Sequence, residues 1–219
     1  RGDQVWIKQG DGAPRSVSLP PMRHLGVDFA GYNYQEAVKV SADGRYLVVV
    51  STKFGRLQVF DTASGTLVWG APAGSVYDIR TMAIWSRGGH RLYWRDNAGV
   101  HTWDPSQGAI TLIPGLIWYE PSLSPDGHSI AYTVRDPQTF APHVEVRDLD
   151  TGSVVPLPHS LRAGPLFTSP GAIWYRQEKP TPGPGGFSGT GVLFSYDLHT
   201  RQESELPLHA EFGLELYRG

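Results

Sequence analysis

The chain has 219 residues, and 19 lysines and arginines nearly balance 21 aspartates and glutamates, so there is no strong field to attract nucleic acid or an anionic membrane. It contains 26 glycines and 18 prolines but no cysteine, which excludes disulfides, thiolate catalysis and cysteine-based metal sites. No apolar run approaches the roughly 18 residues that a membrane-spanning helix needs.

In chain order, the first predicted elements are two strands, 4–8 and 15–19, joined by a Gly-Asp-Gly turn. A longer phrase then recurs four times. Each copy starts with a tight turn that begins at a serine, and an apolar strand follows the turn. The four turns are Ser-Ala-Asp-Gly at 41–44, Ser-Arg-Gly-Gly at 86–89, Ser-Pro-Asp-Gly at 124–127 and the shorter Ser-Pro-Gly at 169–171.

Each copy continues with a strand that ends in aspartate, a second turn and a short last strand. The aspartates are Asp61, Asp104, Asp148 and Asp197. Asp-Gly turns between β-branched and aromatic runs are typical of antiparallel hairpins, so each copy predicts a four-stranded antiparallel sheet. Such units, about 40 to 45 residues long, bury their faces by stacking around an axis. The predicted fold class is therefore all-β, a β-propeller of four-stranded antiparallel blades.

The Ser-Pro-Asp-Gly turn, the apolar strand and the strand ending in Asp-x-x-x-Gly resemble the TolB-like propeller repeat, a relative of the WD-type repeat. The resemblance covers residues 38–207. That repeat occurs in periplasmic scaffolds, peptidase accessory domains and lectin-like binders, so it identifies the fold better than the function. It implies an extracytoplasmic location, in the periplasm or at the cell surface.

The predicted organisation is one propeller domain over residues 1–219. Residues 1–20 form a half blade, and the full blades cover 21–70, 71–115, 116–158 and 159–207. Residues 208–219 contain a possible closing strand. If it joins the N-terminal pair, the ring closes at five blades; otherwise the chain is a piece of a larger propeller.

The recurrent aspartates stand where a strand enters a turn, so they are predicted to cap backbone amides rather than to act in catalysis. The eight histidines lack the spacing of a metal site. The glycine-rich stretch 183–191 has neither the Lys-Ser/Thr of a phosphate-binding loop nor the spacing of a nucleophile elbow, and we expect it to be a mobile loop. No catalytic residue, cofactor or metal is predicted.

Loop placement carries the functional prediction. Two insertions, 135–142 and 177–191, both connect a second to a third strand and should share a face with the connections between blades. Those connections hold aromatic and arginine residues, which are enriched in binding hot spots. The predicted binding residues are Tyr77, Arg80, Trp118, Tyr119 and Arg162. The alternative for each is packing between blades.

The sequence therefore predicts a non-catalytic scaffold that binds a protein, peptide or glycan on the face with the two insertions. The alternative is the propeller of an enzyme. It would be the accessory domain of a prolyl-oligopeptidase-like hydrolase, or a propeller enzyme with a metal or quinone bound in its channel.

Overall fold

The structure is a computed structural model, and it describes residues 3–8, 11–19, 38–51, 56–71, 83–183 and 186–209. These residues form 18 strands and no helix, as the sequence predicts. In this part of the chain there is consequently no helix long and apolar enough to cross a membrane. The chain divides into two compact units, Arg1–Ile117 (unit 1) and Trp118–Gly219 (unit 2).

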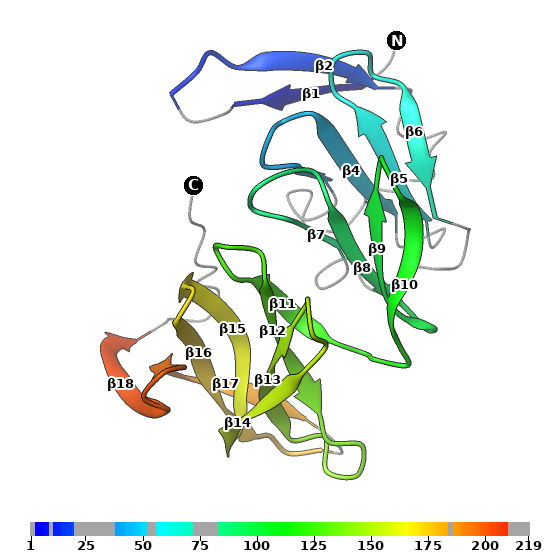
Figure 1. Cartoon of the computed structure of the whole chain (residues 1–219). Helices are drawn as coiled ribbons and strands as arrows, with labels where there is room; N and C mark the ends of the chain where they lie inside the picture. Colours follow the sequence, from blue (N-terminus) through cyan, green and yellow to red (C-terminus); the bar gives the residue numbers. More distant parts are fainter. Residues whose placement is uncertain are drawn as a thin grey trace. The chain divides into compact units, whose positions relative to one another are not determined.

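Unit 1 holds one two-stranded sheet and two four-stranded sheets (Figure 1). The two-stranded sheet pairs β1 (Asp3–Ile7) with β2 (Arg15–Leu19). The next blade contains β3 (Val38–Val40), β4 (Tyr46–Ser51), β5 (Arg56–Asp61) and β6 (Leu67–Gly70). The blade after it contains β7 (Ala83–Trp85), β8 (Leu92–Asp96), β9 (Gly99–Asp104) and β10 (Gly108–Pro114).

Unit 2 holds two four-stranded sheets with the same strand order. One contains β11 (Tyr119–Leu123), β12 (Ser129–Arg135), β13 (Pro142–Asp148) and β14 (Val154–Ser160). The other contains β15 (Arg162–Ser169), β16 (Ala172–Pro180), β17 (Phe187–Asp197) and β18 (Gln202–His209). All four blades are antiparallel meanders, which confirms the predicted four full blades and the partial N-terminal one. The closing strand expected after His209 falls outside the described residues.

Every blade has two ends that differ in their connections. At the turn end lie the turns between the first and second strands and between the third and fourth. At the loop end lie the connections between the second and third strands and between successive blades. The serine and aspartate of the repeat build the turn end: the Ser124 hydroxyl donates to Asp126 Oδ1 (2.5 Å) and accepts from the Ser129 amide (2.9 Å). Gly127, with φ +79°, closes this turn in a conformation that favours glycine.

The structure corrects the loop expected at 177–191. There β16 continues to Pro180 and β17 begins at Phe187, and the two strands pair through Glu178–Gly189 and Lys179–Ser188. Only the short segment 181–186 between the strands connects them. The prediction was wrong because ladder hydrogen bonds come from the main chain, so glycines can extend a long hairpin despite their weak strand preference.

Three apolar clusters pack the blades. In unit 1, Ile7 and Val17 pack with Leu47, Val49 and Phe60, which joins the two-stranded sheet to the next blade. In unit 2, another cluster combines residues of β13, β15 and β16 with Leu157 and Tyr196.

The remaining cluster, also in unit 1, is rich in indole rings. Trp69 lies 4.9 Å from Trp94 and 5.7 Å from Trp103, measured between ring centroids. Trp85 lies 6.4 Å from Trp103. These side chains come from two successive blades, so aromatic packing joins the blades here.

Candidate functional site

The predicted binding residues divide into three groups. Tyr77 and Arg80 lie outside the described residues. Trp118 and Arg162 are buried, and Tyr119 is partly exposed at the loop end of unit 2. Of the three predicted residues that the structure describes, Tyr119 alone stands where its side chain can reach a partner.

The prediction of direct contact by Trp118 is wrong. Its side chain is 0% exposed and its ring lies 6.1 Å from that of Tyr132. Packing is the role that the alternative interpretation assigned to it, because a large aromatic side chain gains most by leaving water.

Arg162 is also placed differently from the prediction, since it is only 8% exposed. Its Nε and Nη2 donate to the two carboxylate oxygens of Glu203 (3.1 and 2.7 Å), and its guanidinium lies 4.0 Å from the Phe194 ring centroid. The Tyr175 hydroxyl donates to the same carboxylate. Burial opposes ionisation of Glu203, but these donors outweigh it and lower its pKa. Arg162 therefore fastens β15 to β18 across one blade.

Three aromatic residues at the loop end of unit 2 lie around Arg135, the last residue of β12. Its guanidinium carbon lies 5.9 Å from the Tyr119 ring centroid and 5.8 Å from that of Phe187. Both distances allow a cation–π interaction. Phe140, in the connection between β12 and β13, is 50% exposed, and its carbonyl accepts from Arg135 Nη1 (3.3 Å). We call Tyr119, Arg135, Phe140 and Phe187 the arginine–aromatic site.

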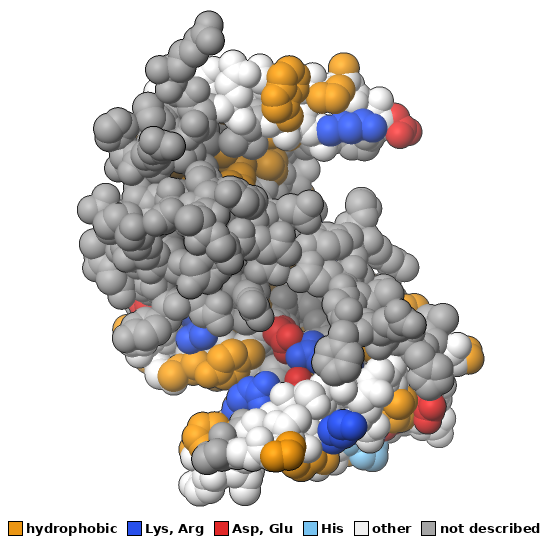
Figure 2. Space-filling view, turned by 180° about the vertical axis from the view of Figure 1, so that it is seen from behind, with side chains coloured by type: hydrophobic (Ala, Val, Ile, Leu, Met, Phe, Trp, Pro, Cys, Tyr) orange, Lys and Arg blue, Asp and Glu red, His pale blue; other side chains and the backbone are white. Residues whose placement is uncertain are grey.

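An ionic network with one buried carboxylate, that of Glu178, lies directly beside this site. Glu178 is 4% exposed, and its carboxylate faces two arginines: Oε1 lies 2.9 Å from Arg176 Nη2 and Oε2 lies 3.5 Å from Arg135 Nη2. Arg176 Nη2 also contacts Glu120, at 2.7 Å. Burial disfavours the charge of Arg176, but Glu120 and Glu178 outweigh it and raise its pKa. On the face drawn in Figure 2, acidic and basic side chains likewise lie close together in the lower part of the view.

Gly164 makes room for this network. Its φ is +61°, and a Cβ at this position would overlap the guanidinium of Arg176. The Gly164 amide donates to Thr133 Oγ1 (2.9 Å), whose hydroxyl lies 3.4 Å from Glu120 Oε2. The bulge of β15 at Gly164 thus lets Arg176 of one blade reach Glu120 of the other.

Arg135 is the least tightly held cation of this group. Its two polar contacts with described residues, at 3.3 and 3.5 Å, are long, and its side chain is 29% exposed. A guanidinium has five N–H donors, so most of them are available to oxygens of a partner. The arrangement can bind a polar or anionic group beside an apolar one.

The turn ends confirm the structural role predicted for the recurrent aspartates. Asp148 Oδ1, for example, accepts from the amides of Asp150 (2.9 Å) and Thr151 (2.7 Å). These bonds lower the pKa of Asp148, and equivalent bonds within their own turns lower those of Asp61, Asp104 and Asp197. Within the described ranges, no three histidine or acidic residues are grouped to hold a metal ion.

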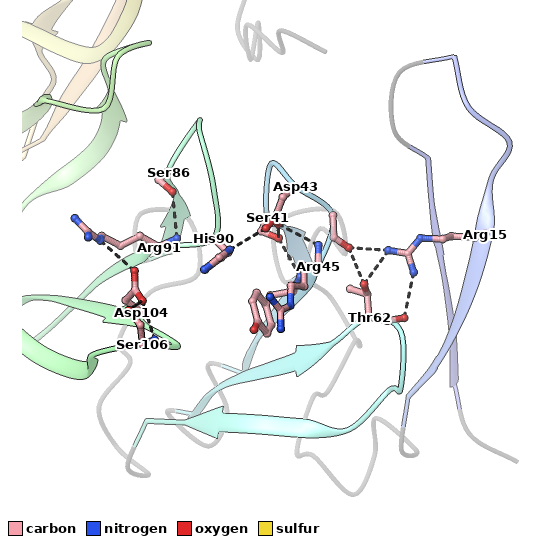
Figure 3. Close-up of polar contacts among 12 residues, drawn as sticks. Arg15, Ser41, Asp43, Arg45, Thr62, Ser86, His90, Arg91, Asp104 and Ser106 are labelled. Atoms are coloured by element: carbon pink, nitrogen blue, oxygen red, sulfur yellow. Dashed lines mark hydrogen bonds and ion pairs between the residues drawn. The ribbon is translucent and has the colours of Figure 1, made fainter.

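In unit 1 the turn ends also carry contacts between blades (Figure 3). Arg15 Nη2 donates to the Gly44 carbonyl (2.6 Å) and to Thr62 Oγ1 (2.8 Å) of the next blade. Asp43 in turn pairs with His90 of the blade after it, at 2.8 Å. These contacts link three successive sheets.

Comparison with known proteins supports the fold. The sequence matches no protein-family model and no curated protein. Among solved structures, TolB from Acinetobacter baumannii is similar, with 18% identity and a TM-score of 0.57, over 90% of this chain and 47% of that one. A putative TolB from Agrobacterium tumefaciens has 18% identity and a TM-score of 0.52, over 77% and 60% of the two chains. The fold is that of a TolB-like β-propeller.

The TolB-like blade arrangement is shared with enzymes. An oligogalacturonate lyase in complex with manganese has 12% identity and a TM-score of 0.57, over 96% of this chain and 62% of that one. At such identities the likeness is one of fold alone. The chain spans between 47% and 62% of the length of the three structures.

Sequence reasoning missed part of the site. Phe187 and Glu178 lie in the segment that its glycines and prolines predict to be a loop, although the aromatic residues Phe187, Phe194 and Tyr196 do mark a strand. Phe140 and Arg135 fell inside a predicted insertion but were not singled out. An exposed aromatic residue in an insertion was the available signal.

Proposed function

We propose that this TolB-like propeller is a non-catalytic binding domain, and that the loop end of unit 2 recognises a protein, peptide or glycan through the arginine–aromatic site. The observation that carries the proposal is Arg135, held between Tyr119 and Phe187 with exposed Phe140 beside it. Arginine and aromatic anchors supply most of the binding energy in hot spots.

The ionic network supports the same role, because it fixes the site before a partner arrives. Glu178 and Arg176 of β16 form ion pairs with Arg135 and Glu120 of the preceding blade. These side chains are therefore already ordered, and a partner does not have to order them on binding. The partner would place an acidic or carbonyl oxygen on Arg135 and an apolar group on Phe140. This chemistry favours a protein or peptide among the three ligand classes.

The proposed location is extracytoplasmic, as the TolB-like resemblance implies. Fractionation of the source organism with an antibody against this chain tests that location. The alternative function, as the propeller of an enzyme, rests on fold likeness to proteins such as the lyase. It requires catalytic residues, and turnover that disappears on their substitution would support it.

The binding proposal is tested with a phage-displayed library of random peptides and with a glycan array. Peptides enriched on the wild-type protein should lose about tenfold in affinity with Phe140→Ala and with Arg135→Ala. Val68→Ala, which truncates a comparably exposed apolar side chain in unit 1, is the matched control and should change nothing. Peptides or glycans whose binding survives the Phe140 and Arg135 substitutions would contradict this placement of the site.

A further inference from the structure

A cleft lies in unit 2, toward the turn end, away from the arginine–aromatic site. It is a cleft of about 540 Å³ between β13 and β14 of one blade and the turn after β17 of the other. Its volume is within the range of small-molecule sites, roughly 300 to 1,000 Å³. Val146, Leu157, Tyr196 and Leu198 line it, so its floor continues the apolar core.

The corresponding place in unit 1 is occupied by a cation. Arg15, the first residue of β2, enters between Gly44 and Thr62 of the next blade and binds their oxygens (Figure 3). In unit 2 the matching position is Val155, since it pairs with Val146 of the apolar core as Arg15 pairs with Ile7, and the residue after the turn aspartate is Leu198 instead of Thr62. Both changes replace hydrogen-bonding groups with apolar ones, so in unit 2 this space is an apolar cleft.

One cation lines the cleft from the other blade. Arg201 has φ +58°, and its amide donates to the Asp197 carbonyl, which fixes its position in the turn. Over the described part of the chain, the Arg201 side chain has no carboxylate within salt-bridge distance. A guanidinium beside an apolar floor is suited to an amphiphilic anion.

An acidic residue also lines the cleft. Asp148 directs Oδ1 to the amides of Asp150 and Thr151 and to the Thr151 hydroxyl, so this oxygen is satisfied by its own turn. The carboxylate of Asp148 remains charged and repels an anion, whereas Arg201 attracts it. Substituting each residue in turn separates the two effects.

The outer strand narrows the choice of ligand. β14 is the last strand of its sheet, and its residues Pro156 and Pro158 line the cleft. Proline has no backbone N–H, so these positions cannot pair with an added strand. The cleft is therefore built for a small molecule rather than for an extended peptide.

We propose that this cleft binds a small apolar carboxylate, with its hydrocarbon against Val155, Tyr196 and Leu198 and its carboxylate at Arg201. The site goes beyond the proposed function, since it uses other residues at the other end of the blades. The ligand would occupy the space that an arginine of the chain occupies in unit 1.

The experiment follows backbone amides by NMR during titration with hexanoate, with hexanamide and hexylammonium as neutral and cationic probes of equal length. Saturable shifts in the segments 154–157 and 198–201 are expected for hexanoate. Arg201→Gln should weaken hexanoate binding roughly tenfold and leave hexanamide unchanged. Asp148→Asn, which can still cap its turn, should strengthen hexanoate binding.

Three results would overturn the proposal: no saturable binding of hexanoate, equal binding of hexanamide, or tighter binding of hexylammonium that Asp148→Asn weakens. Phe140→Ala is the control that separates the two proposals. It should leave hexanoate binding unchanged even though it weakens recognition at the arginine–aromatic site.

Discussion

The blades of unit 1 and unit 2 share a strand order but place their described polar contacts between blades differently. In unit 1, Arg15 and the Asp43–His90 pair join successive blades at the turn end. In unit 2, Glu178 with its two arginines joins the blades at the loop end, and the turn end holds a cleft. Apolar clusters join the blades within each unit. The polar contacts between blades can therefore lie at different ends in different blades, and the end without them is left open to a ligand.

The largest expected effect comes from Glu178→Ala, because it leaves two arginines without their shared carboxylate. We expect the free energy of unfolding to fall by about 3 kcal/mol, measured by urea denaturation. Glu205→Ala, which removes an exposed carboxylate from β18, is the control and should cost little. Equal losses for the two variants would show that the network does not join the blades.

A smaller effect is expected for the contacts at the turn end of unit 1. Arg15→Ala removes three hydrogen bonds to the next blade and should lower the free energy of unfolding by about 1 kcal/mol, since the side chain is partly solvated. Arg201→Ala is the matched substitution in unit 2. It should leave thermal stability unchanged, and a loss as large as that of Arg15→Ala would remove the contrast between the two turn ends.

The smallest effect concerns the two histidines that directly follow the first turn of a blade, His90 and His128. His90 pairs with the preceding blade, whereas His128 pairs with Asp150 of its own blade, with Nδ1 and Oδ2 2.7 Å apart. The hydrogen bond that His128 donates to Asp150, followed by the charge of Asp150, raises the pKa of His128 above 6.5. The pair therefore stabilises the fold fully below pH 6.5, and this contribution is lost as pH rises through the higher folded pKa.

An NMR titration checks this assignment. The pKa of His128 should lie above 6.5 in the wild type and return toward 6.5 in Asp150→Asn. Because both side chains are largely exposed, the melting temperature should hardly change. A His128 pKa at or below 6.5 in the wild type would show that the pair does not form in solution.

The sequence predicted the fold well where local chemistry decides it. Turns such as that around Asp126 use residues adjacent in the chain, so their type and role are readable from the sequence. The site was less predictable because it depends on contacts between blades. Arg176 and Glu120 are far apart in the sequence and meet only because a bulge and a glycine intervene. Trp118 and Tyr119 are adjacent aromatic residues that the sequence does not distinguish, but Trp118 is buried and Tyr119 is partly exposed.

The indole cluster of unit 1 has an optical consequence. Rings as close as those of Trp69, Trp94 and Trp103 couple their electronic transitions, which gives near-ultraviolet circular dichroism a signature that depends on the packing of two blades. Unit 2 contains Trp118 and Trp174, neither of which belongs to this cluster. Loss of the coupled signal would therefore report on unit 1 alone. The unfolding of unit 1 can thus be followed separately from that of unit 2.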